Sequence, residues 1–150
     1  MLPPLNDALL TALQTAAFLA VGGLALRFAS PRGAVVARAV LAAGLGAAAL
    51  MHVVQLVERG PIGASDQPLA FNLFWTSLAL VDPLGALLLT LRPRAGILLT
   101  LAIMGADVTV NLVALGHRSV LSPESWRLWV QMAYAALALA VAPRIWAAAR

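Results

Sequence analysis

Long apolar segments alternate with short polar ones along the whole chain. The apolar segments lie at residues 7–28, 34–57, 69–91, 95–115 and 124–143. Each is close to the ~20 residues that an α-helix needs to cross a bilayer. Short stretches rich in Pro, Gly, Ser or charge end each segment, as is usual where helices stop. The pattern predicts an all-α, polytopic integral membrane protein, a single domain over residues 1–150 built as a bundle of about five transmembrane helices.

Composition supports the membrane assignment. Of the 150 residues, 62% are hydrophobic and only 11% are charged, whereas a soluble domain is about 45–50% apolar and about 25% charged. The mean hydropathy is +0.92. All ten basic residues are Arg, and with so much Ala and Leu this indicates a GC-rich, bacterial genome. No run of basic residues suggests nucleic-acid binding.

Cysteine is absent and only two histidines occur, His52 and His117. Thiol chemistry, iron–sulfur ligation and a haem held by two histidines inside the bundle are therefore not expected. We expect no metal site and no cofactor. The first apolar segment has no basic residues before it and is too long for a signal peptide, so we interpret it as a retained span.

The distribution of arginine predicts the orientation in the membrane. Seven arginines flank one side of the predicted bundle, namely Arg27, Arg32, Arg38, Arg92, Arg94, Arg144 and Arg150. Three lie on the other side, Arg59, Arg118 and Arg127. Because the cytoplasmic side carries the excess of basic residues, we expect a cytoplasmic C-terminus and an outside N-terminus, in the bacterial inner membrane.

Small residues are concentrated in the second predicted span, including Gly44, Gly46 and Ala48. Small side chains let neighbouring helices approach closely in membranes. We interpret them as a sign of tight packing inside the bundle, and a homodimer interface is the alternative.

Polar residues inside four of the predicted spans are the candidates for function, because ionisable groups are costly in hydrocarbon and functional by default. Their spacing places them on one face of each helix, mostly at a similar depth. We predict a shared, apolar-walled pocket with a few convergent polar groups. The candidate catalytic residues are Asp107, Asp82, His52 and Glu58, and the candidate ligand-binding residues are Gln55, Asn72, Trp75, Thr76, Asn111, Gln131 and Tyr134.

Several of these residues have a structural alternative. Asp82 precedes Pro83, which leaves the carbonyl of Ala79 without its helical partner, and a protonated Asp82 could bond to that carbonyl. Asp107 and Asn111 stand one turn apart and could hold helices together. His52 could be a neutral core histidine.

The outermost candidates have structural alternatives as well. Glu58 could be a solvated interfacial charge and Trp75 an interfacial anchor. Tyr134, well inside the fifth span, needs a hydrogen-bond partner, for which Gln131, Asn111 or Asp107 are the candidates.

The layout resembles the emopamil-binding protein and sigma-2 receptor group, the EXPERA-type membrane proteins. The resemblance covers residues 51–134 and involves the segments at 51–60, 74–83 and 105–111, which hold His52, Glu58, Asp82 and Asp107. It implies a five-helix fold with an outside N-terminus and a pocket lined by these residues and Asn111. It also implies sterol isomerase chemistry and binding of amphiphilic amines. In the isomerases the His and Glu stand one helical turn apart, whereas His52 and Glu58 are six residues apart. The resemblance therefore does not specify which reaction this chain would catalyse.

The sequence therefore favours a membrane-embedded pocket for a small lipophilic molecule, such as an isoprenoid, a sterol-like compound or an amine. Carboxylic acids in a dry pocket favour the protonated form and could drive an acid–base isomerisation or cyclisation; if ionised, they would attract a cation. The alternative is a non-enzymatic membrane subunit or a small transporter whose acids pack helices or relay protons. The sequence shows no inverted repeat, which ranks transport lower.

Overall fold

The computed structural model describes residues 20, 31–60, 67–116 and 125–149. They form four long α-helices: α2 (Pro31–Arg59), α3 (Leu69–Leu91), α4 (Pro93–Leu115) and α5 (Trp126–Ala148). All four are long and apolar enough to cross a membrane. The all-helical class is thus confirmed for the described chain, with four such helices where about five were predicted. The first predicted span, residues 7–28, lies outside the described residues apart from residue 20.

The helix ends follow local sequence signals, with some differences from the prediction. Helices α2 and α4 begin at Pro31 and Pro93, earlier than predicted, because proline has no N–H to lose at the first helical position. Helix α2 ends at Arg59 and is followed by Gly60, which has a φ of +80°, a conformation that glycine adopts without steric cost. Arg92 alone separates α3 from α4.

The predicted end of the last span at Pro143 was wrong, because α5 continues through this proline to Ala148. Proline removes one backbone hydrogen bond from a helix interior. Neighbouring helices often compensate this loss in membrane proteins. Residues 144–148 therefore form the last part of α5.

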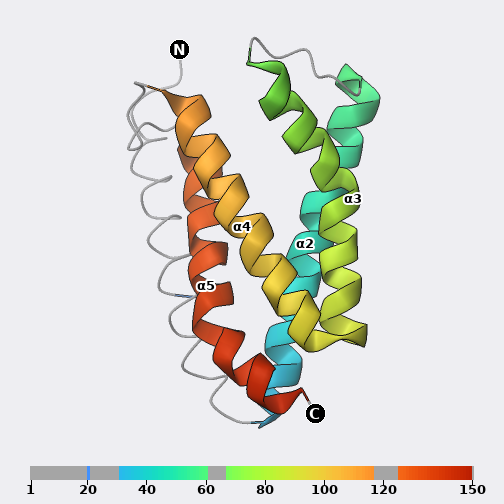
Figure 1. The fold of residues 1–150 in the computed structure, drawn as a ribbon, viewed down its shortest axis with the longest axis vertical. Coiled ribbons are helices and arrows are strands. Elements are labelled where there is room, and N and C mark those ends of the chain that lie inside the picture. Colours follow the sequence, from blue (N-terminus) through green and yellow to red (C-terminus); the bar gives the residue numbers. More distant parts are fainter. Residues whose placement is uncertain (1–19, 21–30, 61–66, 117–124, 150) are drawn as a thin grey trace.

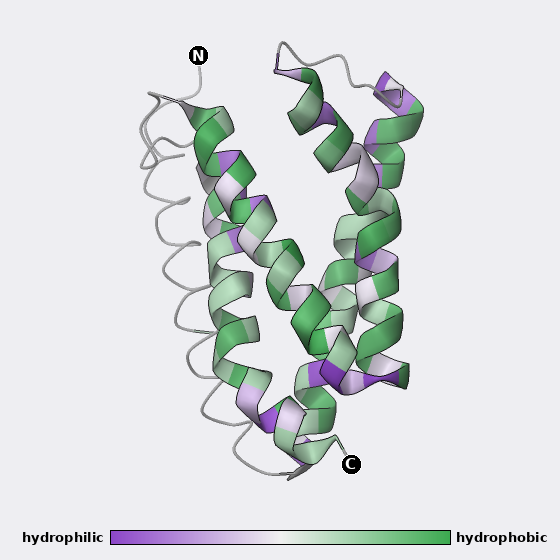
Figure 2. Ribbon diagram, viewed as in Figure 1, coloured by the Kyte–Doolittle hydropathy of each residue, from purple (hydrophilic) through white to green (hydrophobic). Residues whose placement is uncertain are grey.

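The four helices form a ring in which each packs against two neighbours, in the order α2, α3, α4, α5 and back to α2. Consecutive helices run in opposite directions, and α2 with α3 diverges from α4 with α5 toward the end of the bundle where α2 and α4 finish (Figure 1). Hydrophobic residues cover most of each helix, and hydrophilic residues gather toward the helix ends (Figure 2).

The described arginines divide unequally between the two ends of the bundle. Arg32, Arg38, Arg92, Arg94 and Arg144 lie at the end where α2 and α4 begin. Arg59 and Arg127 lie at the opposite end. We call the first the arginine-rich end and the second the open end, because the helix pairs diverge there (Figure 1).

An apolar core fills the bundle from the middle to the arginine-rich end. Leu41, Leu45, Leu89, Val141 and Ile145 are at most 1% exposed. At the arginine-rich end the guanidinium of Arg94 lies 5.5 Å from the ring centroid of Trp146, and its Nε donates a hydrogen bond of 3.3 Å to the Trp146 carbonyl. These contacts join the start of α4 to the end of α5, so this end of the bundle is closed.

Candidate functional site

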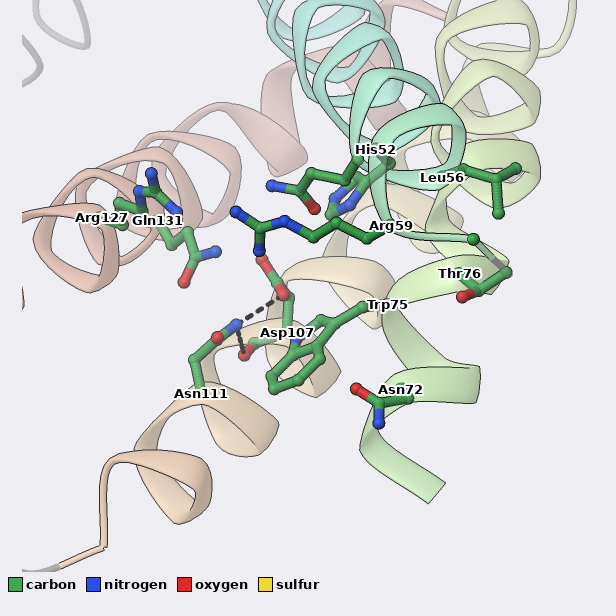
Figure 3. A pocket seen from close by; sticks show the side chains of 12 residues that line it. His52, Leu56, Arg59, Asn72, Trp75, Thr76, Asp107, Asn111, Arg127 and Gln131 are labelled. Atoms are coloured by element: carbon green, nitrogen blue, oxygen red, sulfur yellow. Dashed lines mark hydrogen bonds between the residues drawn. The ribbon is translucent and has the colours of Figure 1, made fainter. Parts of the chain in front are cut away.

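A cavity of about 310 Å³ lies at the open end, between the two diverging helix pairs. All four described helices contribute to its wall. The lining residues are His52, Gln55, Leu56, Arg59, Gly60, Asn72, Trp75, Thr76, Asp107, Asn111, Arg127 and Gln131. Figure 3 shows His52 and Arg59 on one side, Arg127 and Gln131 on the opposite side, and Asp107 with Asn111 between them.

Most of the residues that the sequence singled out meet in this cavity. His52, Gln55, Asn72, Trp75, Thr76, Asp107, Asn111 and Gln131 all line it. They come together because they lie in the C-terminal halves of α2 and α4 and in the N-terminal halves of α3 and α5, and the antiparallel arrangement brings these halves to one level. Three further candidates, Glu58, Asp82 and Tyr134, do not line the cavity.

Polar side chains from all four described helices converge in the cavity. Of its twelve described lining residues, nine are polar, and the other three are Leu56, Gly60 and Trp75. Arg59 and Arg127 belong to the lining but were not among the candidates. In the sequence they indicated only the orientation of the bundle, and the divergence of the helix pairs turns them toward a shared cavity.

His52 connects the cavity to a buried acid. Its Nε2 lies 3.8 Å from Oδ2 of Asp82, and the two side chains are 18% and 2% exposed. His52 is on α2 and Asp82 on α3, so the pair joins two helices behind the cavity wall. In the described part of the chain, His52 Nδ1 and Asp82 Oδ1 are buried without a hydrogen-bond partner. A buried polar atom without a partner is costly, and in native proteins such an atom calls for a specific explanation.

The structure does not show the structural role that the sequence offered for Asp82, a hydrogen bond to the carbonyl freed by Pro83. Asp82 makes no hydrogen bond to the carbonyl of Ala79, although both residues are described and both are buried. Asp82 instead faces α2, where its nearest charged or titratable neighbour is His52.

Asp107 is held by its own helix. The side-chain amide of Asn111 donates hydrogen bonds of 2.7 Å to Asp107 Oδ1 and 2.8 Å to the Asp107 carbonyl. Both bonds are internal to α4, so they do not join two helices. They fix the orientation of the carboxyl group, which is 5% exposed and lines the cavity.

Tyr134 has a different partner from those expected. Its hydroxyl donates a hydrogen bond to the backbone carbonyl of Leu41, and not to Gln131, Asn111 or Asp107. The bond links α5 to α2 below the cavity. Glu58 is exposed at the end of α2 and stands outside the cavity wall, so a catalytic role for this acid has no support from its position.

Aromatic and amide side chains complete the wall on α3. The ring of Trp75 packs edge-to-face against Phe71, with centroids 6.1 Å apart. The Asn72 amide donates a hydrogen bond of 3.2 Å to the Gln67 carbonyl just before the helix. On α5, Gln131 Oε1 is buried, and the described residues offer it no hydrogen-bond partner.

The arrangement can bind a polar group through several donors and a single acid. No group of three His, Cys, Asp or Glu residues within the described ranges converges as a metal site would require. The comparisons with known proteins do not narrow the function further. Neither protein-family models, nor curated proteins, nor solved structures gave a match to the chain.

Proposed function

We propose that this chain is an integral membrane protein whose cavity binds the polar head of a small lipophilic molecule. The main support for this proposal is the cavity, in which nine polar side chains from four apolar helices converge. Placing so many polar groups inside membrane-spanning helices is costly unless they serve a ligand or one another. His52 Nδ1 and Gln131 Oε1 are buried in this wall without a hydrogen-bond partner among the described residues, and a ligand in the cavity would supply one.

The apolar exterior supports insertion in a bilayer. Leu80 is 78% exposed, Leu91 69% and Leu139 63%, on three different helices. Such faces are stable in lipid and would aggregate in water. With the arginine-rich end in the cytoplasm, as the positive-inside rule requires, the cavity opens toward the outer leaflet and the C-terminus is cytoplasmic.

A pair of tryptophan variants on α2 tests the binding function. Leu56 lines the cavity and Leu50 is 64% exposed on the same helix. Leu56→Trp should fill the cavity, whereas Leu50→Trp makes the same change outside it. The unfolding of both variants and the parent protein is measured in neutral detergent, with and without a panel of isoprenoid, sterol-like, acidic and amine compounds.

A compound present at 100 times its dissociation constant stabilises the folded state by about 2.7 kcal/mol. We expect one compound class to stabilise the parent protein and Leu50→Trp, and to have no effect on Leu56→Trp. The proposal is wrong if no compound stabilises the parent protein, or if Leu56→Trp is stabilised to the same extent.

Acid–base isomerisation or cyclisation of the bound molecule is the second candidate, favoured by His52 and Asp107 in the wall and by Asp82 behind His52. A protonated group would add its proton to a double bond, and a base would remove another proton from the adjacent carbon. The resemblance to the EXPERA-type group agrees with this chemistry. Asp107→Asn and Asp82→Asn should abolish turnover of a bound alkene while the fold is preserved. Loss of the folded bundle in both variants would instead indicate a packing role for the acids.

A further inference from the structure

The cavity wall carries more positive than negative charge. Among the described residues that line it, Arg59 and Arg127 are the two arginines and Asp107 is the only acid. Asp107 already accepts a hydrogen bond from Asn111, which reduces its capacity to bind a cation. The exposed Glu58 lies outside the wall. With His52 neutral, the described residues of the wall therefore carry a formal charge of +1, or +2 if Asp107 is protonated.

Both arginines lie at the mouth of the cavity and come from opposite helix pairs. Arg59 is the last residue of α2, and Arg127 is the second residue of α5. His52 lies seven residues before Arg59, about 10 Å further along the helix axis. The wall thus has its basic groups at the mouth and its titratable groups His52 and Asp107 deeper. Figure 3 shows the Arg59 side chain reaching over the cavity from the end of α2.

Arg94 at the arginine-rich end differs from Arg59. Arg94 there lies against Trp146 and donates to its carbonyl, which is how an arginine anchors a helix end at a membrane interface. Arg59 makes no hydrogen bond and no ion pair within the described chain, and its position over the cavity leaves its five N–H donors close to whatever the cavity holds. Guanidinium groups bind carboxylates and phosphates in a bidentate manner, which is the usual reason for arginine at such a place.

Exposed apolar side chains cover the outside of α3 and α4 at the level of the mouth. Leu73 on α3 is 51% exposed, and Leu112 and Val113 on α4 are 40% and 61% exposed. They lie at the same end of the bundle as Arg59 and Arg127. Their spacing from the lining residues turns them away from the cavity, so a hydrocarbon chain that extends from a bound head group into the bilayer would lie against this apolar exterior. A small hydrophilic anion would leave it unused.

From this charge distribution we infer that the ligand is an anionic amphiphile, with a phosphate or carboxylate head held between Arg59 and Arg127 and an apolar chain lying against α3 and α4. The inference rests on the proposed binding function and specifies its ligand class. A cationic amine, one of the ligands that the sequence suggested, would meet two like charges at the mouth. Asp107 and Asn111 then face the inner side of the head group.

A chain-matched set of probes tests the inference. Dodecyl phosphate, dodecanoate, dodecanol and dodecylamine share one hydrocarbon chain and differ in the charge of the head, and inorganic phosphate carries the head without the chain. Each is added below its micelle concentration to the purified protein in neutral detergent, and dissociation constants are obtained from the stabilisation against unfolding. The variants are Arg59→Gln, Arg127→Gln and, as a matched control, Arg32→Gln at the opposite end of α2.

We expect dodecyl phosphate or dodecanoate to bind at least about tenfold more tightly than dodecanol, and dodecylamine to bind most weakly. Arg59→Gln and Arg127→Gln should each weaken binding of the anion by about tenfold or more, the usual effect of losing a charge-assisted hydrogen bond. Arg32→Gln should leave it unchanged. Binding of inorganic phosphate as tight as that of dodecyl phosphate would show a soluble anion as the ligand and overturn the amphiphile.

The outcomes separate this inference from the proposed function. If dodecanol or dodecylamine binds as tightly as the anions, or if the Arg59 and Arg127 variants behave like Arg32→Gln, the anionic ligand is wrong while the binding cavity stands. If no probe and no compound of the wider panel stabilises the protein, the binding function itself fails. Should an arginine variant not fold, the order of the four probes on the parent protein still decides the inference.

Discussion

The contact between Gly44 and Tyr134 gives the sharpest test of the packing below the cavity. Gly44 on α2 faces the ring of Tyr134 on α5, and a methyl group added at Gly44 would lie 2.9 Å from Cζ and 3.0 Å from the hydroxyl oxygen. The Tyr134 hydroxyl donates to the Leu41 carbonyl on the same face of α2. The ring therefore cannot move away from Gly44 without weakening this hydrogen bond.

Gly46 on the same helix is the matched control. A methyl group at Gly46 would meet nothing within 4 Å. In a helix interior alanine is favoured over glycine by up to about 1 kcal/mol, and this gain applies to both positions. The difference in unfolding free energy between Gly44→Ala and Gly46→Ala therefore isolates the contact with Tyr134.

We expect Gly44→Ala to be less stable than Gly46→Ala by about 1–3 kcal/mol, the usual cost of an extra methyl group in a packed interior. Loss of the bond to Leu41 would contribute about 0.5–1.5 kcal/mol of this cost. Gly46→Ala should be as stable as the parent protein or slightly more so. Unfolding is measured by titration with a denaturing detergent in mixed micelles, followed by circular dichroism.

A double-mutant cycle assigns the cost to one contact. In a Tyr134→Ala background the methyl group at Gly44 has room, so Gly44→Ala should then cost no more than Gly46→Ala. Equal stability of the two alanine variants in the parent background would refute the proposed contact. A penalty at Gly44 that persists without the Tyr134 ring would show that the close approach of α5 to α2 has another cause.

Two further predictions concern the rest of the bundle. A methyl group at Gly96 on α4 would meet the backbone of Leu88 and Leu89 on α3, whereas one at Gly105 would meet nothing within 4 Å. Gly96→Ala should therefore lower the unfolding free energy by about 1–3 kcal/mol relative to Gly105→Ala. Equal stabilities of the two variants in the same titration would contradict the close approach of α4 to α3. Leu45 is fully buried and Leu50 is 64% exposed, so Leu45→Ala should destabilise the bundle and Leu50→Ala should not. Because the side chains of the unfolded state are surrounded by lipid or detergent, we expect Leu45→Ala to lower the unfolding free energy by less than the ~2–5 kcal/mol seen in soluble cores. Equal effects of the two variants would place Leu45 outside the core.

Much of the candidate site followed from the helical repeat. His52 and Gln55, or Asp107 and Asn111, stand three or four residues apart and must share a face of their helix. The depth of each residue followed from its distance to the nearest polar loop. Helix face and depth together were sufficient to select eight candidates that line one cavity. They could not show which neighbour each side chain meets, because that depends on how each helix is rotated against the next.

Two of the three candidates outside the cavity illustrate this limit. Asp82 and Tyr134 were assigned to the pocket from depth and face, but packing places Asp82 behind His52 and directs Tyr134 to the Leu41 carbonyl. The glycines show the same limit. Gly44 and Gly46 are equivalent in a sequence of small residues, yet one receives the Tyr134 ring and the other has open space beside it.

The sequence by itself determined the helices, their approximate lengths and the arginine-rich end, because hydrophobic length and charge act along one chain and need no partner. Tertiary structure alone decided that the helix pairs diverge at the open end. It thereby made a cavity with a polar wall and turned Arg59 and Arg127 toward it. The physical reason is that the apolar core fills the bundle only from its middle to the arginine-rich end. The packing of all four helices together decides which residues fill their shared interior.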